Sequence, residues 1–156
     1  MSPIVVSTQV AAPLERVFEV FTDLANAAER IPSITELEIL SDGPFGDGTR
    51  WRETRVIMKK EATEEMWVTG FNPPHGYTVE AQSHGMLYQT RFDFEFDGER
   101  TKVSWTFDGK PLTIMTKLTA PIFAVLFRSF SKRCMLEDME ALRDVCESQE
   151  AELAAS

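Results

Sequence analysis

The hydrophobic positions of this chain repeat with two different periods, and the period changes along the sequence. Residues 4–10 place Ile4, Val6 and Val10 on one side of an alternating pattern, which predicts a half-buried strand. Residues 14–21 instead carry apolar side chains at the i, i+3, i+4 and i+7 spacing of one helical face. A second short helix is predicted to end before Pro32, since proline disfavours the helical conformation in the residue before it. The chain therefore starts as a strand followed by two short helices.

From residue 34 to residue 109 the pattern is that of strands and turns. The segment "ITELEIL" has strand character, and the turn sequences "MKKE", "NPPHG", "SHG", "DGER" and "DGKP" divide residues 49–109 into five further strands. The connections are short, whereas parallel neighbours need a crossover of about a dozen residues or more. These strands are therefore predicted to form an antiparallel meander.

After Pro111 the sequence changes to a long helical pattern that contains no glycine. Pro121 lies inside it and removes a helix hydrogen bond, so we expect a kink or a restart there rather than a straight helix over 112–148. The apolar residues of the predicted inward stripe are Leu118, Ile122, Leu126, Phe130, Met135, Met139, Leu142 and Cys146.

Together these elements predict one α+β domain over residues 1–150, followed by a frayed tail over 151–156. An antiparallel sheet of about seven strands coils because of its twist, and a long helix buries its apolar stripe by lying across the concave face. The predicted architecture is a helix-grip fold: a curved antiparallel sheet around a long C-terminal helix, with two short helices between the first two strands.

The segment "RWRETRVIM" at 50–58 has charges on both of its faces, so it does not show by itself which face is inner. The later strands settle this, because Phe92 and Phe94 on one strand, and Trp105 on the next, alternate with polar residues. Extending that apolar face through the hairpins places Glu53 and Arg55 on the concave side.

The pairing of these charges depends on the position of the hairpin tip. A tip at Lys59 and Lys60 sets Arg55 opposite Glu64, with Glu53 two positions away, so that Arg55 can bond Glu64 and also reach Glu53. Buried charges stabilise a solid core little, whereas a cavity that holds water or a polar ligand group accommodates them. The charges therefore indicate a pocket wall. The alternative is a salt-bridge network near the sheet rim, or a register shifted by one residue.

Composition and charge narrow the classes of partner. With 43% hydrophobic and 26% charged residues the chain has the composition of an ordinary globular domain, and a net charge of −9 argues against broad binding to nucleic acid or to anionic membranes. The start "MSPIVVSTQV" lacks the basic and apolar regions of a secretory signal, so a cytoplasmic location is expected.

Neither the cysteines nor the histidines predict a cofactor site. Cys134 and Cys146 are roughly 18 Å apart along the predicted helix, beyond disulfide reach, and are expected to be free thiols. His75 and His84 follow no metal-ligand spacing. No metal and no cofactor are expected.

The segments "APLERVFEVFTDLAN", "GPFGDGTRWRETR" and "EATEEMWVTGFNPPHGYTVEAQSHG", with a closing helix after "GKPLT", resemble the START-like (SRPBCC) superfamily, in particular its polyketide cyclase/dehydrase-like branch. The resemblance covers nearly the whole chain. It implies a deep, mostly apolar cavity between the sheet and the terminal helix, used for lipids, aromatic polyketides or other hydrophobic small molecules. It carries no invariant catalytic motif.

Three hypotheses about function follow. The first is a non-catalytic protein that binds a hydrophobic small molecule, and the second is a cyclase or dehydratase that uses a cavity carboxylate as general base. The third is a vestigial cavity in a protein that interacts with another protein. The candidate catalytic residues are Glu53, Arg55 and Glu64. The candidate ligand-binding residues are Trp51, Met66, Tyr77, Tyr88, Thr90, Phe92, Trp105, Ile122, Leu126 and Phe130.

The apolar run "APIFAVLFRSF" around Pro121 is expected to supply a gate to the cavity. It is shorter than the roughly 20 apolar residues that cross a bilayer, so no stable membrane insertion is expected. Because both of its faces are apolar, it could also support a homodimer.

Overall fold

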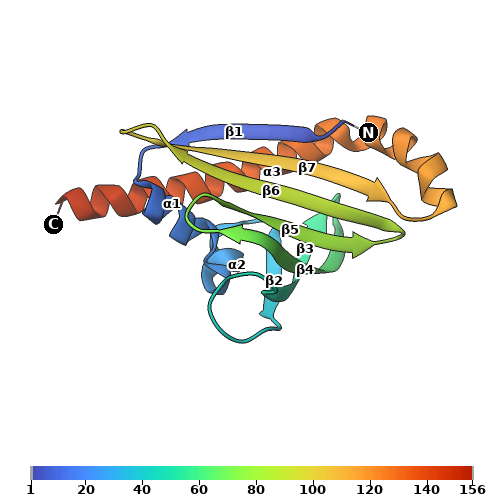
Figure 1. Ribbon diagram of the computed structural model, residues 1–156, viewed down its shortest axis with the longest axis horizontal. Coiled ribbons are helices and arrows are strands. Elements are labelled where there is room, and N and C mark those ends of the chain that lie inside the picture. The colour runs from blue at the N-terminus through green and yellow to red at the C-terminus, as the bar shows by residue number, and fades with distance from the viewer. Residues whose placement is uncertain (1, 156) are drawn as a thin grey trace.

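The structure, a computed structural model, describes residues 2–155 and has the predicted helix-grip architecture (Figure 1). Within this range seven strands form one antiparallel sheet in the order β1-β7-β6-β5-β4-β3-β2. Two short helices and a 3₁₀ turn connect β1 to β2, and the long helix α3 lies along the sheet. The elements are β1 (Ile4–Val10), α1 (Leu14–Phe21), η1 (Leu24–Asn26), α2 (Ala27–Arg30), β2 (Ile34–Ile39), β3 (Arg50–Ile57), β4 (Lys60–Asn72), β5 (Gly76–Ser83), β6 (Met86–Phe96), β7 (Thr101–Pro111) and α3 (Ile114–Ala155).

The two faces of β3 are those predicted from the later strands. Trp51 and Glu53 are buried, whereas Arg50 and Arg52 are exposed. The pairing of β5 with β6 keeps the same face inward, since Tyr77 lies opposite Phe92 and Ala81 opposite Tyr88. The concave face of the sheet is therefore the apolar one, and it includes the carboxylate of Glu53.

The predicted pairing of β3 with β4 is wrong by two residues. The hairpin tip lies at Met58 and Lys59, which both have positive φ, so that Arg55 pairs with Ala62 and Glu53 with Glu64. Positive φ at both tip residues is usual for a two-residue hairpin turn, but this tip contains no glycine or asparagine to mark it. The inner face is nevertheless correct, because a shift of two residues returns each side chain to the same face.

The second half of α3 belongs to the hydrophobic core, as its stripe predicts. Met139, Leu142 and Cys146 are buried against the sheet together with residues of α1 and β7. Both cysteines are free, and burial raises the pKa of the Cys146 thiol to about 12. Helix α3 continues to Ala155, past the predicted end at 148.

The first half of α3 does not follow the predicted stripe. Leu118, Ile122 and Leu126 are exposed rather than buried, because this stretch is apolar on every side and its periodicity does not identify the inner face. Pro121 is accommodated inside the helix without a restart. Figure 1 shows the first turns of α3, in orange, running at an angle to the rest of the helix.

The start of α3 is tied to the turn between β5 and β6. The backbone N–H of Leu112 and the hydroxyl of Thr116 both donate to the carbonyl oxygen of Gly85, at 2.8 and 3.0 Å. Gly85 has a φ of +77°, a conformation that glycine adopts without steric cost. This connection holds the first turns of α3 over one end of the sheet.

Candidate functional site

A cavity of about 540 Å³ lies between the first half of α3 and the concave face of the sheet. Its volume falls within the roughly 300–1,000 Å³ of small-molecule pockets. The second half of α3 fills the other end of the concave face with packed side chains, so one helix covers both a core and a cavity. The lining residues on the strands and their turn include Ile4, Glu64, Met66, Val79, Ala81, His84, Met86, Tyr88, Thr90, Phe107, Asp108 and Gly109, and those on α3 include Thr116, Thr119, Ala120, Phe123, Ala124, Phe127, Arg128 and Ser131.

Aromatic side chains form two walls of the cavity. Tyr88 on β6 and Phe107 on β7 stack with ring centroids 5.7 Å apart and planes 15° apart. On α3, Phe123 and Phe127 stack at 5.9 Å, and these two side chains remain 56% and 40% exposed. The cavity is therefore bounded by flat apolar surfaces on the sheet and opens to solvent beside the helix.

Gly109 makes room for one of these walls, because it lies opposite Tyr88 in the pairing of β6 with β7. A larger residue at this inward position would extend into the space beside the tyrosine ring.

A few polar side chains line the otherwise apolar cavity. Glu64 projects from β4, and burial together with the charge of Glu53 across the strand pair raises the pKa of its carboxyl. Burial also raises the pKa of Tyr88, and the charge of Glu64 adds to this effect. His84, in the turn before β6, shares a 2.7 Å hydrogen bond between its Nδ1 and the hydroxyl of Ser83. These groups can orient a polar end of a ligand by hydrogen bonding.

Arg128 lines the cavity from α3. Its guanidinium donates to the carbonyl oxygens of Ser2 and Pro3, at 2.9 and 3.1 Å. This contact links α3 to the segment just before β1, the strand at one edge of the sheet.

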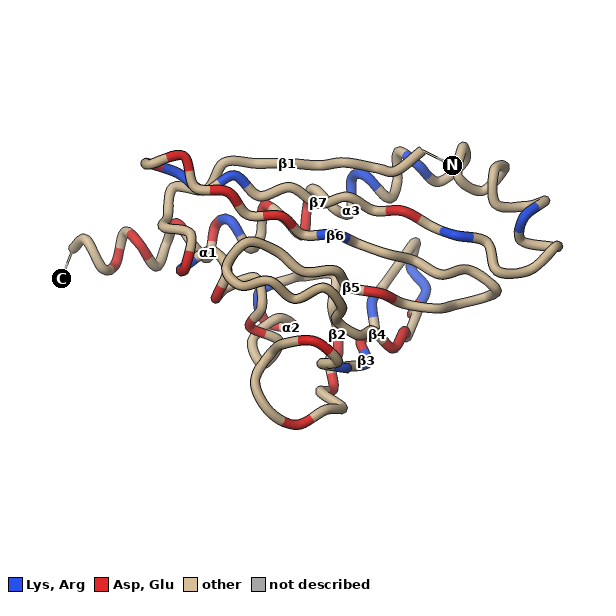
Figure 2. The backbone as a smooth tube through the Cα atoms, viewed as in Figure 1, with Lys and Arg blue, Asp and Glu red and all other residues tan. Residues whose placement is uncertain are grey.

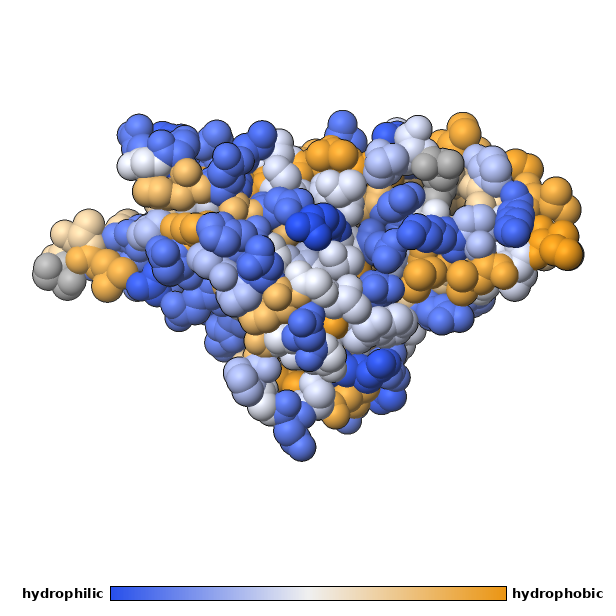
Figure 3. All heavy atoms as spheres, viewed as in Figure 1, coloured by the Kyte–Doolittle hydropathy of each residue, from blue (hydrophilic) through white to orange (hydrophobic). Residues whose placement is uncertain are grey.

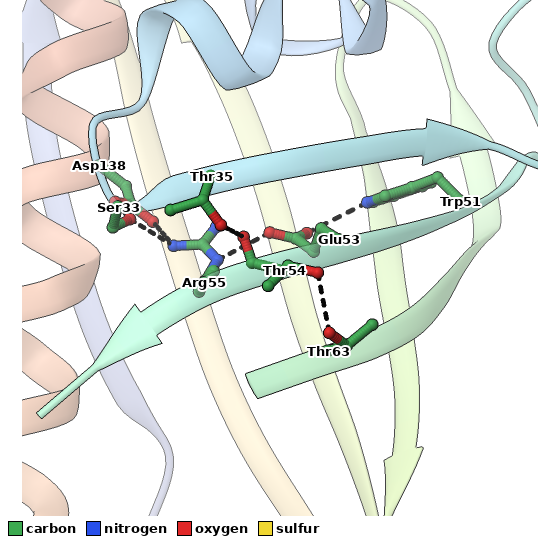
Figure 4. A network of polar contacts seen from close by, with 8 residues as sticks. All are labelled: Ser33, Thr35, Trp51, Glu53, Thr54, Arg55, Thr63 and Asp138. Atoms are coloured by element: carbon green, nitrogen blue, oxygen red, sulfur yellow. Dashed lines mark hydrogen bonds and ion pairs between the residues drawn. The ribbon is translucent and has the colours of Figure 1, made fainter. Parts of the chain in front are cut away.

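The two other candidate catalytic residues belong to a buried network beside the cavity (Figure 4). The carboxylate of Glu53 accepts from Trp51 Nε1 at 3.1 Å and from Arg55 Nε at 2.7 Å. A second nitrogen of Arg55 donates to Asp138 on α3 at 2.5 Å and to the hydroxyl of Ser33 at 3.1 Å. Ser33 in turn donates to Asp138 at 3.2 Å. The network therefore connects β3, the segment before β2, and α3.

The charges of this network balance one another. Burial alone would lower the pKa of Arg55, but the charges of Glu53 and Asp138 outweigh it and raise that pKa above its ordinary value. The guanidinium therefore stays charged and satisfied by two carboxylates. Neither Glu53 nor Arg55 lines the cavity, so of the three predicted catalytic residues only Glu64 faces it.

The predicted ligand-binding residues divide into three groups. Met66, Tyr88 and Thr90 line the cavity. Ile122 and Leu126 are exposed on the outside of α3, and Phe130 is half-buried outside the lining, because the helix is rotated relative to the predicted stripe. The remaining four, Trp51, Tyr77, Phe92 and Trp105, pack in the core.

The core position of these four aromatic residues follows from the helices that precede β2. Phe21 of α1 packs edge-on against Trp105 at 6.0 Å, and the Tyr77 hydroxyl donates to the Phe21 carbonyl oxygen at 3.2 Å. Helix α1 therefore occupies the end of the concave face where sequence reasoning placed part of the ligand site.

Sequence reasoning missed the cavity residues on α3 and Phe107. A signal for Phe107 was present, because it follows Trp105 by two positions in the same alternating strand and therefore shares its inward face. Phe123 and Phe127 had no such signal, because the exposed and the inner sides of that stretch are both apolar. Within residues 2–155 no group of three or more His, Cys, Asp and Glu side chains is placed to hold a metal ion.

The fold and the cavity have known counterparts. A family model described as polyketide cyclase/dehydrase and lipid transport matches residues 1–147. The chain belongs to this family. The resemblance to SRPBCC proteins inferred from the sequence is thereby confirmed, and membership implies a hydrophobic ligand-binding cavity. A comparison with curated proteins found no match to this family member.

Several solved structures share the fold of this family member. TTHA0849 from Thermus thermophilus is 27% identical with a TM-score of 0.65, and the match covers 99% of each chain. The ZhuI aromatase/cyclase from Streptomyces sp. R1128 is 18% identical with a TM-score of 0.74 over 93% of each chain. A norcoclaurine synthase point mutant from Thalictrum flavum is 16% identical with a TM-score of 0.70 over 96% of each chain. Identities this low for the last two support a common fold alone.

Proposed function

We propose that this protein binds a hydrophobic small molecule, such as a lipid or an aromatic or polyketide-like compound, in the cavity between α3 and the sheet. The observation that carries the proposal is the combination of volume and lining: about 540 Å³ with two stacked aromatic pairs and a few polar groups. The Tyr88–Phe107 stack favours a ligand with a flat ring, because offset aromatic contacts add to simple burial of area.

Binding of an apolar fluorescent probe tests the proposal. The purified protein is titrated with 1-anilinonaphthalene-8-sulfonate, and displacement is measured with fatty acids and with aromatic polyketides of two to four rings. We expect a saturable site with a dissociation constant on the order of micromolar or tighter, since an enclosed apolar ligand of this size gains several kcal/mol by burial. Saturable displacement at one site per chain supports the proposal, and absence of saturable binding by any of these compounds contradicts it.

A second function has one specific observation in its favour. Glu64 lies in the cavity with a raised carboxyl pKa, near Tyr88, which suits a general base for the cyclisation or dehydration of a poly-carbonyl substrate. Structural relatives that are described as an aromatase/cyclase and as a norcoclaurine synthase share the fold.

The Glu64→Gln variant separates these two functions. If Glu64 is the base, we expect turnover of an aromatic polyketide precursor to fall at least about 100-fold in Glu64→Gln, the loss of one general base, while probe affinity changes little. Product formation is measured by chromatography and mass spectrometry. Tight binding of the precursor without turnover by the unmodified protein contradicts the enzyme and leaves the binding function in place.

A further inference from the structure

The outward side of the first half of α3 is a continuous apolar surface without a partner element of the fold. We call it the outer face of α3, and it consists of Ile114, Met115, Leu118, Ile122, Val125 and Leu126. Ile114 and Val125 are each 80% exposed and Leu118 is 71% exposed. Figure 3 shows hydrophobic atoms gathered at the end of the molecule where Figure 1 has the first turns of α3. Exposed apolar surface of this kind marks a site of interaction with a protein or a membrane.

Charge is segregated along the same segment. Residues 109–136 contain five basic residues and no acidic residue, although the whole chain has 25 acidic residues and a net charge of −9. Figure 2 shows this contrast as blue without red along the first half of α3. The basic residues are Lys110, Lys117, Arg128, Lys132 and Arg133. The local electrostatic potential at this segment is therefore positive, although the net charge of the whole chain is negative.

We propose that the outer face of α3 docks on the surface of a bilayer that contains anionic lipid. Helices that lie in a membrane interface combine an exposed apolar side with flanking Lys and Arg, which is the arrangement found here. The apolar side chains enter the boundary between headgroups and acyl chains, and each basic residue near the surface contributes further attraction to anionic headgroups.

Docking of a second copy of the chain on this face fits the charges less well. A symmetric contact between two outer faces brings exposed basic residues such as Lys132 and Arg133 toward their counterparts, which is repulsive. An anionic surface has the opposite sign, so it complements the segment. Charge therefore favours an anionic lipid surface, rather than a second copy of the chain, as the partner of the outer face.

The proposed contact is peripheral and does not span the bilayer. By length and composition alone α3 is one helix that could cross a membrane. However, its inner side carries Thr116, Thr119 and Ser131 on the cavity, and Arg128 is bonded to the start of β1. Spanning would remove these contacts, whereas docking of the outer face keeps all of them.

Docking also positions the mouth of the cavity. Phe123 and Phe127 line the cavity and remain partly exposed on the same segment of α3. The opening of the cavity therefore lies beside the docked surface. The proposal goes beyond ligand binding, and docking itself does not depend on whether the cavity is occupied.

Co-sedimentation with vesicles tests this proposal on the full chain. Vesicles of phosphatidylcholine alone are compared with vesicles that contain about one third phosphatidylglycerol, at low salt and at roughly 0.5 M salt. We expect binding to the anionic vesicles that falls with salt. The double variant Leu118→Glu/Val125→Glu should lower the partition coefficient at least about 100-fold, and Lys132→Gln/Arg133→Gln on the order of tenfold. Val5→Glu, on the exposed outer side of β1, is the matched control and should bind like the unmodified protein.

Each outcome decides the proposal. Salt-sensitive binding to anionic vesicles that only the α3 variants lose supports it. No binding to anionic vesicles at low salt overturns it, as does equal loss in Val5→Glu and in the α3 variants. Analytical ultracentrifugation of the same variants tests whether the outer face of α3 is instead a dimer interface. If the unmodified protein is a dimer and Leu118→Glu/Val125→Glu is a monomer, the face binds a second copy and the proposal is overturned. Circular dichroism checks that each variant is folded. The probe titration tests ligand binding in the cavity separately, so failure of membrane docking leaves the proposed ligand-binding function untouched.

Discussion

Replacing Arg55 with methionine is expected to lower the free energy of unfolding by about 3–5 kcal/mol at pH 7. The variant leaves the carboxylates of Glu53 and Asp138 in the interior without the guanidinium that each of them bonds. Uncompensated buried charges are among the most destabilising consequences of a single substitution. Equilibrium unfolding in urea, followed by circular dichroism, measures the change.

The deficit should depend on pH. Burial raises the pKa of Asp138, and Arg55 opposes that rise, so the variant raises this pKa further. A carboxyl whose pKa in the folded state lies above its unfolded value is favourable below the unfolded pKa, and this contribution is lost as pH rises through the folded pKa. The difference between the variant and the unmodified protein should therefore be larger at pH 7 than near pH 4.

Arg52→Met is the matched control for this prediction. Arg52 lies on the same strand and has ion pairs with Glu38 and Glu65 at 3.3 and 3.8 Å, but it is on the exposed face. Surface pairs contribute about 0–1 kcal/mol, so its loss should be small and independent of the interior carboxylates. Equal destabilisation by the two substitutions would show that burial of the network is not what matters.

Filling the cavity with Thr90→Trp is expected to weaken binding of the fluorescent probe at least about 100-fold, or roughly 2.7 kcal/mol. Thr90 lies on the cavity floor opposite Phe107 of β7 and Val79 of β5, so an indole at this position occupies the space between the sheet and α3. The fold should survive, because the added volume enters a void rather than a packed core. Fluorescence titration of the folded variant measures the effect.

Thr106→Trp provides the comparison with the same residue type on the other face. Thr106 lies next to Phe107 in β7, and its pairing partners Val5 and Arg91 are exposed, so the new indole points away from the cavity. Its probe affinity should match that of the unmodified protein. If Thr90→Trp kept full affinity while folded, the probe would have to bind elsewhere and the cavity assignment would fail.

The fold was predicted well from local sequence patterns. It depends on which side chains alternate inward and on the order of the strands, and not on the exact register between them. The alternation in β6 and β7 placed Trp51, Glu53 and Arg55 on the concave side, although the hairpin tip at Met58 and Lys59 carried no sequence mark. An error of two residues preserves the face of every side chain. It does change the partners, which is why Arg55 was paired with Glu64 instead of Ala62.

The candidate site was harder to predict, because it depends on contacts that are distant in sequence. Asp138 bonds Arg55 across 83 positions, and nothing in either segment marks the pair. The rotation of α3 decides which residues reach the cavity, and an apolar stretch such as 118–127 has no polar side to fix that rotation. Helix α1 also limits the extent of the cavity. Its Phe21 packs against Trp105, which was expected to form an aromatic wall of the ligand site.

The division of α3 has a consequence for how the helix opens. Around Met139 and Asp138 the helix is held by core packing and hydrogen bonds, so we expect the amide hydrogens there to exchange only with global unfolding. The first half lies over a cavity and contains Pro121, so we expect its amides to exchange through local opening at a lower free energy. A ligand in the cavity would add its binding free energy to that opening. Ligand occupancy of the cavity would then increase the protection of amide hydrogens in the first half of α3, even where it leaves the global stability of the domain unchanged.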